Sequence, residues 1–472
     1  MSNFIAVNSL LSKNSLAAMH NELTYLKLVD RQLDNLWGDK THGFRPGDTY
    51  RINRPAQFAP VIGNSMPFNS STGAFSTNAF VEDPIFVSLS TNDQAFIPVS
   101  FNSHELTLQL DNEDSRVGVP AGLRLATQVE QKSILESALH GGVFYADIGS
   151  GSTVNKATQA DFLQAQAILS SLTCPIEDRS VIIPPKMMAD LAANNLTLFT
   201  PSKNEEIYVK GELTEFAGAM FHHSNLVPDY PAVPGLVAAV SAGYTFVEGA
   251  TLIPVTFATT GFYSNGVIIT FASKYRVNPE TKAKLGDLPY GFAIATPASV
   301  FGNAGYPQGN GTIAVASLTA TQLQYINPAY TAGTYLTYPA GATDVFGVNA
   351  TATVSIPVYI DSSAAIYSAA DSGNRQNITT APAAGDTLAI VGSTTKSLKQ
   401  ALMFTKEGLT ATVIPLTTDL PGAYAVRADH DGVSLRVATQ AQVGTDIVFW
   451  RFDALSLARL LRDQYVIRIL VG

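Results

Sequence analysis

The end of the chain, from residue 401 to residue 472, carries the pattern that most constrains the fold. Val433–Thr439 and Thr445–Asp453 alternate apolar with polar residues, which is typical of half-buried β-strands. Ala401–Phe404 is a short apolar run followed by a polar helix start at Thr405–Glu407. No catalytic arrangement falls in this segment. A chain that ends in packed strands without a site is more typical of an assembling protein than of an enzyme.

Composition narrows the class of protein further. The chain has 472 residues, enough for two or three domains. Charged residues make up only 14%, well below the usual share of about a quarter. Such a chain must bury much surface, either within itself or against copies of itself. The net charge of −9 argues against a general nucleic-acid binder, which needs a basic surface.

Neither secretion nor a membrane span is expected. The single cysteine, Cys174, cannot form an intrachain disulfide, and without a histidine nearby in sequence we interpret it as a small core residue. Met1–Ser15 lacks the basic start and apolar run of a signal peptide. No apolar run reaches the roughly 18 residues that a membrane helix needs. We expect a chain that folds in a cytoplasm.

Three helices are predicted from periodicity and end signals. Leu16–Leu36 places apolar side chains three and four residues apart and is either a core helix or an arm lying on a neighbouring subunit. Pro120–His140 has apolar residues four apart, a proline in its first turn and Gly141–Gly142 as its stop. Thr158 and Asp161 form a capping box ahead of a third helix.

Two regions are expected to be β-rich. Residues 43–112 place Gly, Pro, Asn and Ser between short apolar runs, and residues 231–395 lack helical periodicity. Between Lys284 and Arg375 there is no other lysine or arginine and there are only four acidic residues. This composition fits an all-β module that interrupts the α+β pattern around it.

No catalytic, cofactor-binding or metal site is predicted, and the chain is not expected to be an enzyme. His222 and His223 are neighbours on an expected strand, so their side chains point to opposite faces and cannot chelate one ion. The acidic cluster at 111–114 fits helix capping better than metal binding. Gly149–Ser152 is not a phosphate loop, because no Gly-Lys-Ser/Thr follows it.

A series of short motifs resembles, in chain order, the major coat proteins of tailed phages of the podovirus type, which have the Hong Kong 97-like fold. The series covers about two thirds of the chain. The matching segments are Gly47–Pro55, Asp161–Leu172, Asp178–Pro185, Gly211–Gly218, Ser224–Pro228, Phe404, Lys406, Gly408, Gly432–Val437, Asp446–Ile447, Arg451, Asp453 and Leu455. Thr214 and Ala219 depart from the pattern, where a glycine and an aromatic residue are expected.

The resemblance implies an α+β chain with the Hong Kong 97-like capsid fold and an inserted all-β domain. The implied parts are an N-terminal arm at 1–42, an extended hairpin with peripheral strands at 43–112, a spine helix at 113–142, the first part of an axial domain at 143–230, the insertion at 231–395 with an extra subdomain at about 305–372, and the remaining axial and peripheral part at 396–472. For 305–372 a folding aid or a lateral clamp between capsomers is favoured over receptor or glycan binding.

The function implied by the resemblance is that of a structural capsid protein. Many copies would form pentamers and hexamers that build the icosahedral shell around packaged DNA, in a virion assembled in the host cytoplasm. The implied partners are other copies, a separate scaffolding protein, a portal protein at one vertex and an optional decoration protein, with only weak, non-specific contact to DNA. Because the coat-like pattern starts near residue 1, we expect no cleaved scaffold. Because no lysine lies between Lys40 and Lys132, a hairpin isopeptide crosslink is not available.

Arg51, Arg54, Arg436 and Arg451 are the candidate subunit contacts, because each is an arginine in a short, strand-like segment. Two other functions stay open. An encapsulin-like nanocompartment shell would share the fold, although such chains are usually shorter and lack so large an insertion. A β-rich adhesin or carbohydrate-binding protein would fit residues 231–395 but not the α+β segment before them.

Overall fold

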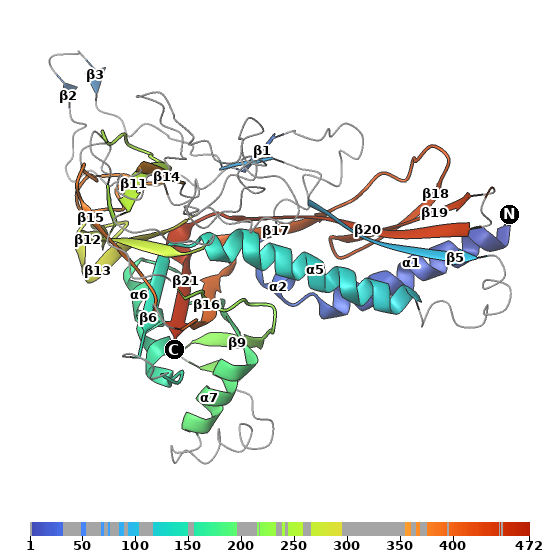
Figure 1. Ribbon diagram of the computed structural model, residues 1–472, viewed down its shortest axis with the longest axis horizontal. Helices are drawn as coiled ribbons and strands as arrows, with labels where there is room; N and C mark the ends of the chain where they lie inside the picture. The colour runs from blue at the N-terminus through green and yellow to red at the C-terminus, as the bar shows by residue number, and fades with distance from the viewer. Residues whose placement is uncertain are drawn as a thin grey trace, which may run out of the picture.

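The structure is a computed structural model of the whole chain, and three sheets and a long helix organise it (Figure 1). The described residues are 2–31, 49–52, 68–69, 74–75, 85–88, 93–102, 117–149, 155–195, 215–216, 218–232, 238–240, 244–257, 266–294, 355–359, 365–368, 375–393, 396–442, 444 and 447–472.

An antiparallel sheet of five strands, called the long sheet below, runs beside the long helix α5 (Figure 1). Its elements are β5 (Gln94–Asn102), β17 (Leu409–Ile414), β18 (Tyr424–His430), β19 (Val433–Gln442), β20 (Ile447–Leu460) and α5 (Val119–Ser137). One face of the sheet packs Leu435, Val437, Trp450 and Phe452 into a core shared with α5. The helix predicted at 120–140 is therefore present, with a final 3₁₀ turn at Ala138–His140.

The strands predicted at the C-terminal end form, but one of them is more buried than its sequence pattern indicates. In β19 the residues from Val433 to Thr439 are all buried, so the half-buried interpretation of this stretch is wrong. Helices cover one face. On the other face the chain after β17 lies against the strand, because Arg436 donates to the carbonyl of Thr417 at 2.8 Å. A segment that is distant in sequence and covers a strand cannot be inferred from the alternating pattern of the strand itself.

The N-terminal segment, residues 2–31, packs on α5 and on β18 and β19. The sequence predicts one helix over Leu16–Leu36, but the structure has α1 (Ser2–Glu22), a break, and α2 (Tyr25–Leu28). At the break, the Glu130 carboxylate on α5 accepts the backbone N–H of Tyr25 at 2.7 Å. After α2 the chain extends, and Asp30 bridges in parallel to β17. Residues 32–36 lie outside the described residues.

Apolar burial holds this N-terminal segment within its own chain. Leu23, Leu26 and Val29 are 0–2% exposed in the core shared with α5 and the long sheet. At Gly122 of α5 a β-carbon would lie 2.3 Å from the carbonyl oxygen of Ser15, so glycine is what permits the close approach of α1 and α5. For the described residues the core-helix alternative is the one that fits.

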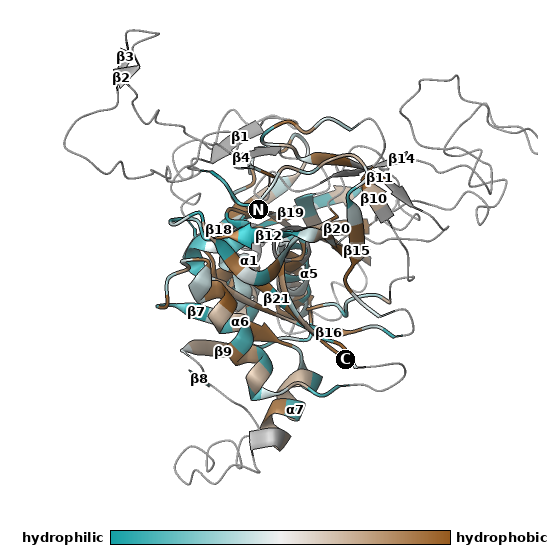
Figure 2. Ribbon diagram, turned by 90° about the vertical axis from the view of Figure 1, so that its left-hand side faces the viewer, coloured by the Kyte–Doolittle hydropathy of each residue, from teal (hydrophilic) through white to brown (hydrophobic). Residues whose placement is uncertain are grey.

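A second, mixed sheet lies to one side of the long sheet (Figure 1). Its strand order is β6 (Val143–Asp147), β21 (Val466–Val471), β16 (Lys399–Thr405), β7 (Arg179–Ile183), β9 (Ala219–His223) and β8 (Glu215–Phe216). Helices α6 (Gln159–Ser171) and α7 (Pro185–Asn195) pack apolar side chains against it. The predicted capping box is present: Asp161 accepts the N–H of Thr158 at 2.7 Å. Figure 2 shows hydrophobic residues on β16 and hydrophilic ones near β18.

The third sheet is antiparallel and drawn entirely from the region 231–395. Its strand order is β13 (Lys284–Ala293), β12 (Ile268–Val277), β15 (Thr387–Ile390), β10 (Ala238–Val240), β11 (Leu252–Phe257) and β14 (Ser355–Tyr359). The chain leaves and returns at one point, because Tyr230 and Leu398 exchange backbone hydrogen bonds of 2.8 and 2.9 Å. The two ends of this region therefore lie side by side.

Two buried arginines join the third sheet to the rest of the fold. Arg276 on β12 pairs with Asp463, just before β21, at 2.7 Å, and Asp463 also accepts the N–H of Gly142 at the end of the α5 region. Arg468 on β21 donates to the carbonyls of Leu139 and Gly266 at 3.0 and 2.6 Å. The long helix, the mixed sheet and the third sheet therefore meet at one polar junction.

The remaining strands are short. β1 (Thr49–Ile52) pairs with β4 (Ile85–Ser88), and β2 (Phe68–Asn69) pairs with β3 (Ala74–Phe75). The rest of the expected extended hairpin lies outside the described residues, as does almost all of 305–372. β5, which we expected among peripheral strands, pairs with β20 along its whole length.

Candidate assembly surface

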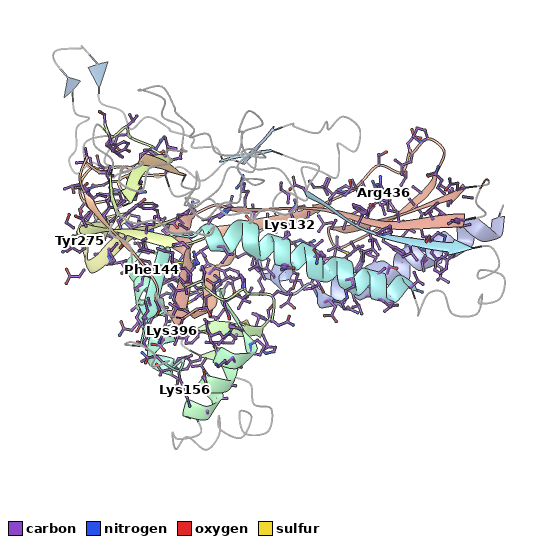
Figure 3. The ribbon with its side chains drawn as sticks, in the orientation of Figure 1. Lys132, Phe144, Lys156, Tyr275, Lys396 and Arg436 are labelled. Carbon is purple, nitrogen blue, oxygen red and sulfur yellow. The ribbon has the colours of Figure 1, made fainter. Side chains whose placement is uncertain are left out.

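The four candidate arginines fall in different surroundings. Arg51 lies in β1, where only the backbone is described, and Arg54 is outside the described residues. Arg436 is 7% exposed, and its Nη2 and Nε lie 2.7 and 3.1 Å from Oδ2 of Asp453 (Figure 3). The guanidinium of Arg436 therefore already has a charged hydrogen-bond partner within its own chain. Among the described residues, Arg451 is the candidate that reaches the surface.

Arg451 is held in place from two sides. Its Nε lies 2.6 Å from Oδ1 of Asp453, a carboxylate that is 0% exposed and also serves Arg436. Its guanidinium carbon lies 4.3 Å above the ring of Phe96, a cation–π contact. Even so, 45% of its side chain is exposed. An arginine fixed in one orientation loses little entropy when it binds a partner.

Apolar side chains lie beside Arg451 on the face of the long sheet opposite α5, where the chain after β17 covers Arg436 but leaves Arg451 exposed. The pairing of β5 with β20 sets Pro98 opposite Arg451, and Phe449 lies two residues away on the same face. Phe96 and Phe449 are 53% and 40% exposed. We call Phe96, Pro98, Phe449 and Arg451 the Arg451 patch. Aromatic residues and arginine are the types enriched at the centres of protein interfaces.

The sheet presents this patch because its two faces differ. The face of β20 that carries Trp450 and Phe452 packs on α5, so alternation puts Phe449 and Arg451 on the opposite face. Pro98 removes a backbone donor from β5, which disfavours the addition of a further strand there. Contact through this face is therefore expected to use side chains.

The remaining candidate groups are the neighbouring pair His222 and His223 and the single cysteine, Cys174. Within the described part of the chain, no group of three or more His, Cys, Asp or Glu residues could hold a metal ion. On β9, His222 is half-buried and His223 is exposed, and burial lowers the pKa of His222. Cys174 is buried, which raises the pKa of its thiol and disfavours the reactive thiolate. No described helix is long and apolar enough to span a membrane.

Comparisons with known proteins find distant likeness in structure. No protein-family model and no curated protein matches the sequence. Among solved structures, the chain is similar to one from Mycobacterium phage Che8, with 9% identity, a TM-score of 0.43, and 95% of this chain and 90% of that chain covered. The chain is also similar to the capsid structure of Cyanophage P-SCSP1u, with 11% identity and a TM-score of 0.40, and the match covers 92% of this chain and 85% of that chain. A third similar structure is the mature capsid of bacteriophage PhiM1, with 8% identity and a TM-score of 0.36, and the match covers 89% of this chain and 81% of that chain.

A virus-like particle from Pyrococcus furiosus is also similar, at 8% identity and a TM-score of 0.33, with 98% of this chain and 99% of that chain covered.

Sequence reasoning missed the residues that organise the interior. Glu130, Arg276, Asp463 and Arg468 were not singled out, although each is at most 6% exposed. Their partners lie far away in sequence, 105 residues for Glu130 and Tyr25. Only the pairing of Arg436 with Asp453 left a local signal, because both residues occur on neighbouring strands of a hairpin.

Proposed function

We propose that this chain is a structural major capsid protein of a tailed bacteriophage, a podovirus-type coat protein with the Hong Kong 97-like fold. Copies assemble through pentamers and hexamers into the shell that encloses the DNA. The observation that carries the proposal is the Arg451 patch, an oriented arginine beside two exposed aromatic residues, Phe96 and Phe449, on a sheet whose other face packs on α5. Such a surface is suited to binding a protein and has no chemistry of its own.

The parts of the fold take roles in this proposal. The long sheet with α5 is the peripheral domain and its spine, the mixed sheet with α6 and α7 is the axial domain, and the third sheet is the inserted β domain within 231–395. Support comes from the order of these parts along the chain and from the closed neck at Tyr230 and Leu398. Residues 305–372 would clamp neighbouring capsomers. A scaffolding protein and a portal protein complete the assembly as partners.

Weak contacts suffice for such a shell. Burying one exposed aromatic side chain contributes about 1.5–3 kcal/mol. Each subunit makes several contacts at once, so the small free energies of the single contacts add up to a stable assembly. Arg451 sets the orientation and the choice of partner more than the affinity. Of the four candidate arginines, we propose Arg451 as a subunit contact. Arg51 and Arg54 keep that proposed role on sequence grounds, whereas Arg436 stabilises the interior of the subunit by pairing with Asp453.

The test compares assembly of the wild-type chain with that of Phe449→Ser and Arg451→Glu. Phe449→Ser removes exposed apolar area, and Arg451→Glu reverses the exposed charge while Arg436 still balances Asp453. Sedimentation velocity should show unchanged monomers and fewer or no large particles for both variants. Val247→Ser, which alters an apolar residue of the third sheet region that is 67% exposed, is the control and should assemble normally. Wild-type particle yield from both patch variants would contradict a role for this surface.

A further inference from the structure

The face of the long sheet opposite α5 carries a second chain segment beside the Arg451 patch. Residues 415–423, called the covering segment below, connect β17 to β18. Arg436 on β19 donates to the carbonyl of Thr417 at 2.8 Å, and Arg427 on β18 donates to that of Leu416 at 3.4 Å. Figure 1 shows this segment rising on the side of the sheet away from α5. The covering segment and the Arg451 patch therefore share one face.

Asp419 gives the covering segment an exposed carboxylate. The backbone N–H of Asp419 donates to the hydroxyl of Thr417 at 3.2 Å, so the backbone is held two residues after its contact with Arg436. The side chain of Asp419 is exposed, and within the described part of the chain no cationic side chain forms an ion pair with it.

The other carboxylates on this face already have partners. Asp453 is 0% exposed and lies 2.7 Å from Arg436 and 2.6 Å from Arg451. Asp429 on β18 pairs with Arg427 at 2.8 Å. Among the carboxylates that the structure describes here, Asp419 is therefore the one left to bind a cation from outside.

Arg451 lies close to the covering segment along the sheet. The strand register sets Ala438 on β19 beside Arg451, and Ala425 on β18 beside Ala438. Two strand spacings of about 4.8 Å make this row roughly 10 Å wide. It reaches β18 near Tyr424, the residue at which the covering segment ends and the strand begins. Asp419 and Arg451, both of which the structure describes, form no ion pair with each other. The face thus presents an exposed cation and an exposed anion that do not neutralise each other.

We infer that this face docks on the same face of a second copy in a two-fold arrangement, with Arg451 of each copy beside Asp419 of the partner subunit. In a two-fold contact each residue meets its counterpart twice, so a surface that carries both charges is complementary to itself. Phe96 and Phe449, 53% and 40% exposed, lie within the contact and are shielded from water there. The inference rests on the proposed self-assembly and names the partner of the Arg451 patch.

A charge swap tests the pairing. Asp419→Lys and Arg451→Glu each place like charges at both symmetric positions of the contact. Each position should weaken association about two- to fivefold, so the Kd measured by sedimentation should rise about four- to twenty-five-fold. The double variant restores opposite charges and should associate nearly as tightly as wild type. An equal mixture of the two single variants should do the same, because a mixed pair has opposite charges at both positions.

Two features of the chain control for other effects of these changes. Asp419→Lys leaves the ion pairs of Asp453 untouched, so its effect does not arise from the interior. Glu280→Lys reverses an exposed carboxylate in the turn between β12 and β13 and should keep the wild-type Kd.

Thiol crosslinking tests the proximity directly. Asp419→Cys and Arg451→Cys each add one exposed thiol, whereas Cys174 is buried. A short bifunctional maleimide should give covalent dimers from a mixture of the two variants and few from either variant alone. Equal yields of dimers from the mixture and from the single variants would place the two positions apart.

The failures of the two proposals are distinguishable. Single charge variants that associate like wild type, or a mixture that associates no better than they do, would overturn the two-fold contact and leave the proposed assembly standing. A wild-type chain that does not associate at all would refute the proposed function together with this contact.

Discussion

Glu130 gives the structure a predicted dependence of stability on pH. Its side chain is 6% exposed on α5, where it accepts the N–H of Tyr25. Burial, with a smaller effect from the charge of Glu22, raises the pKa of Glu130 from 4.5 to about 7. In the unfolded chain the carboxyl returns to its ordinary value.

The sign and size of the effect follow from proton linkage. Between pH 4.5 and 7 the folded chain holds a proton on Glu130 that the unfolded chain has lost, so stability falls as pH rises through this window. A pKa difference of about 2.5 corresponds to roughly 3 kcal/mol, since each unit is worth about 1.4 kcal/mol. The side chain is almost fully buried, so little of this is lost to solvent screening.

Glu130→Gln is the variant that isolates this effect. Glutamine keeps an oxygen acceptor for Tyr25 but cannot ionise. Denaturant unfolding should show that, between pH 5 and pH 8, the free energy of unfolding of the wild type falls by up to about 3 kcal/mol more than that of the variant. Hydrogen exchange at Tyr25 should report the same trend locally. Glu22→Gln, a change of the same charge at an exposed site, should alter the pH slope only slightly.

The reasoning would be refuted if Glu130→Gln kept the wild-type pH slope. The loss of stability on raising the pH would then arise elsewhere in the fold, and Glu130 would not carry a proton in the native chain.

Three further changes test the packing. Gly122→Ala places a methyl group 2.3 Å from the carbonyl of Ser15, so α1 and α5 must separate, and thermal unfolding should show a loss of about 1–3 kcal/mol; an unchanged melting temperature would refute this close approach. Asp463→Asn leaves the buried Arg276 without its counterion and should cost about 3–5 kcal/mol in denaturant unfolding; a loss below 1 kcal/mol would contradict the junction. Cys174 should resist thiol reagents until the chain unfolds, because it is buried with a raised pKa; rapid labelling of the native protein would show otherwise.

The elements predicted best are those whose signals are local. The helix at 120–140 combines a four-residue apolar repeat with a proline start and a glycine stop, and the capping box of Thr158 and Asp161 needs only four consecutive residues. The strands after residue 400 were recognised by alternation. Each of these signals lies in a short stretch of consecutive residues, so the type of element can be recognised without knowing what packs on it, although the burial of β19 cannot.

The features that were missed depend on partners far away in sequence. The predicted helix at 16–36 is interrupted because Glu130, 105 residues later, binds the backbone at Tyr25. Arg436 was proposed as a surface contact, yet a shared buried carboxylate, Asp453, draws it inward and leaves Arg451 outside. No local pattern distinguishes these two arginines. Both lie on the same face of the sheet, and they differ because the chain after β17 covers Arg436 and leaves Arg451 exposed.

Electron microscopy of the purified chain expressed alone, and then with a candidate scaffolding protein, tests the central proposal most directly. The account predicts closed shells, tubes or spirals made of this one chain, and their loss in Arg451→Glu. A chain that stays monomeric or forms only a small oligomer at high concentration, even with scaffold added, would contradict it.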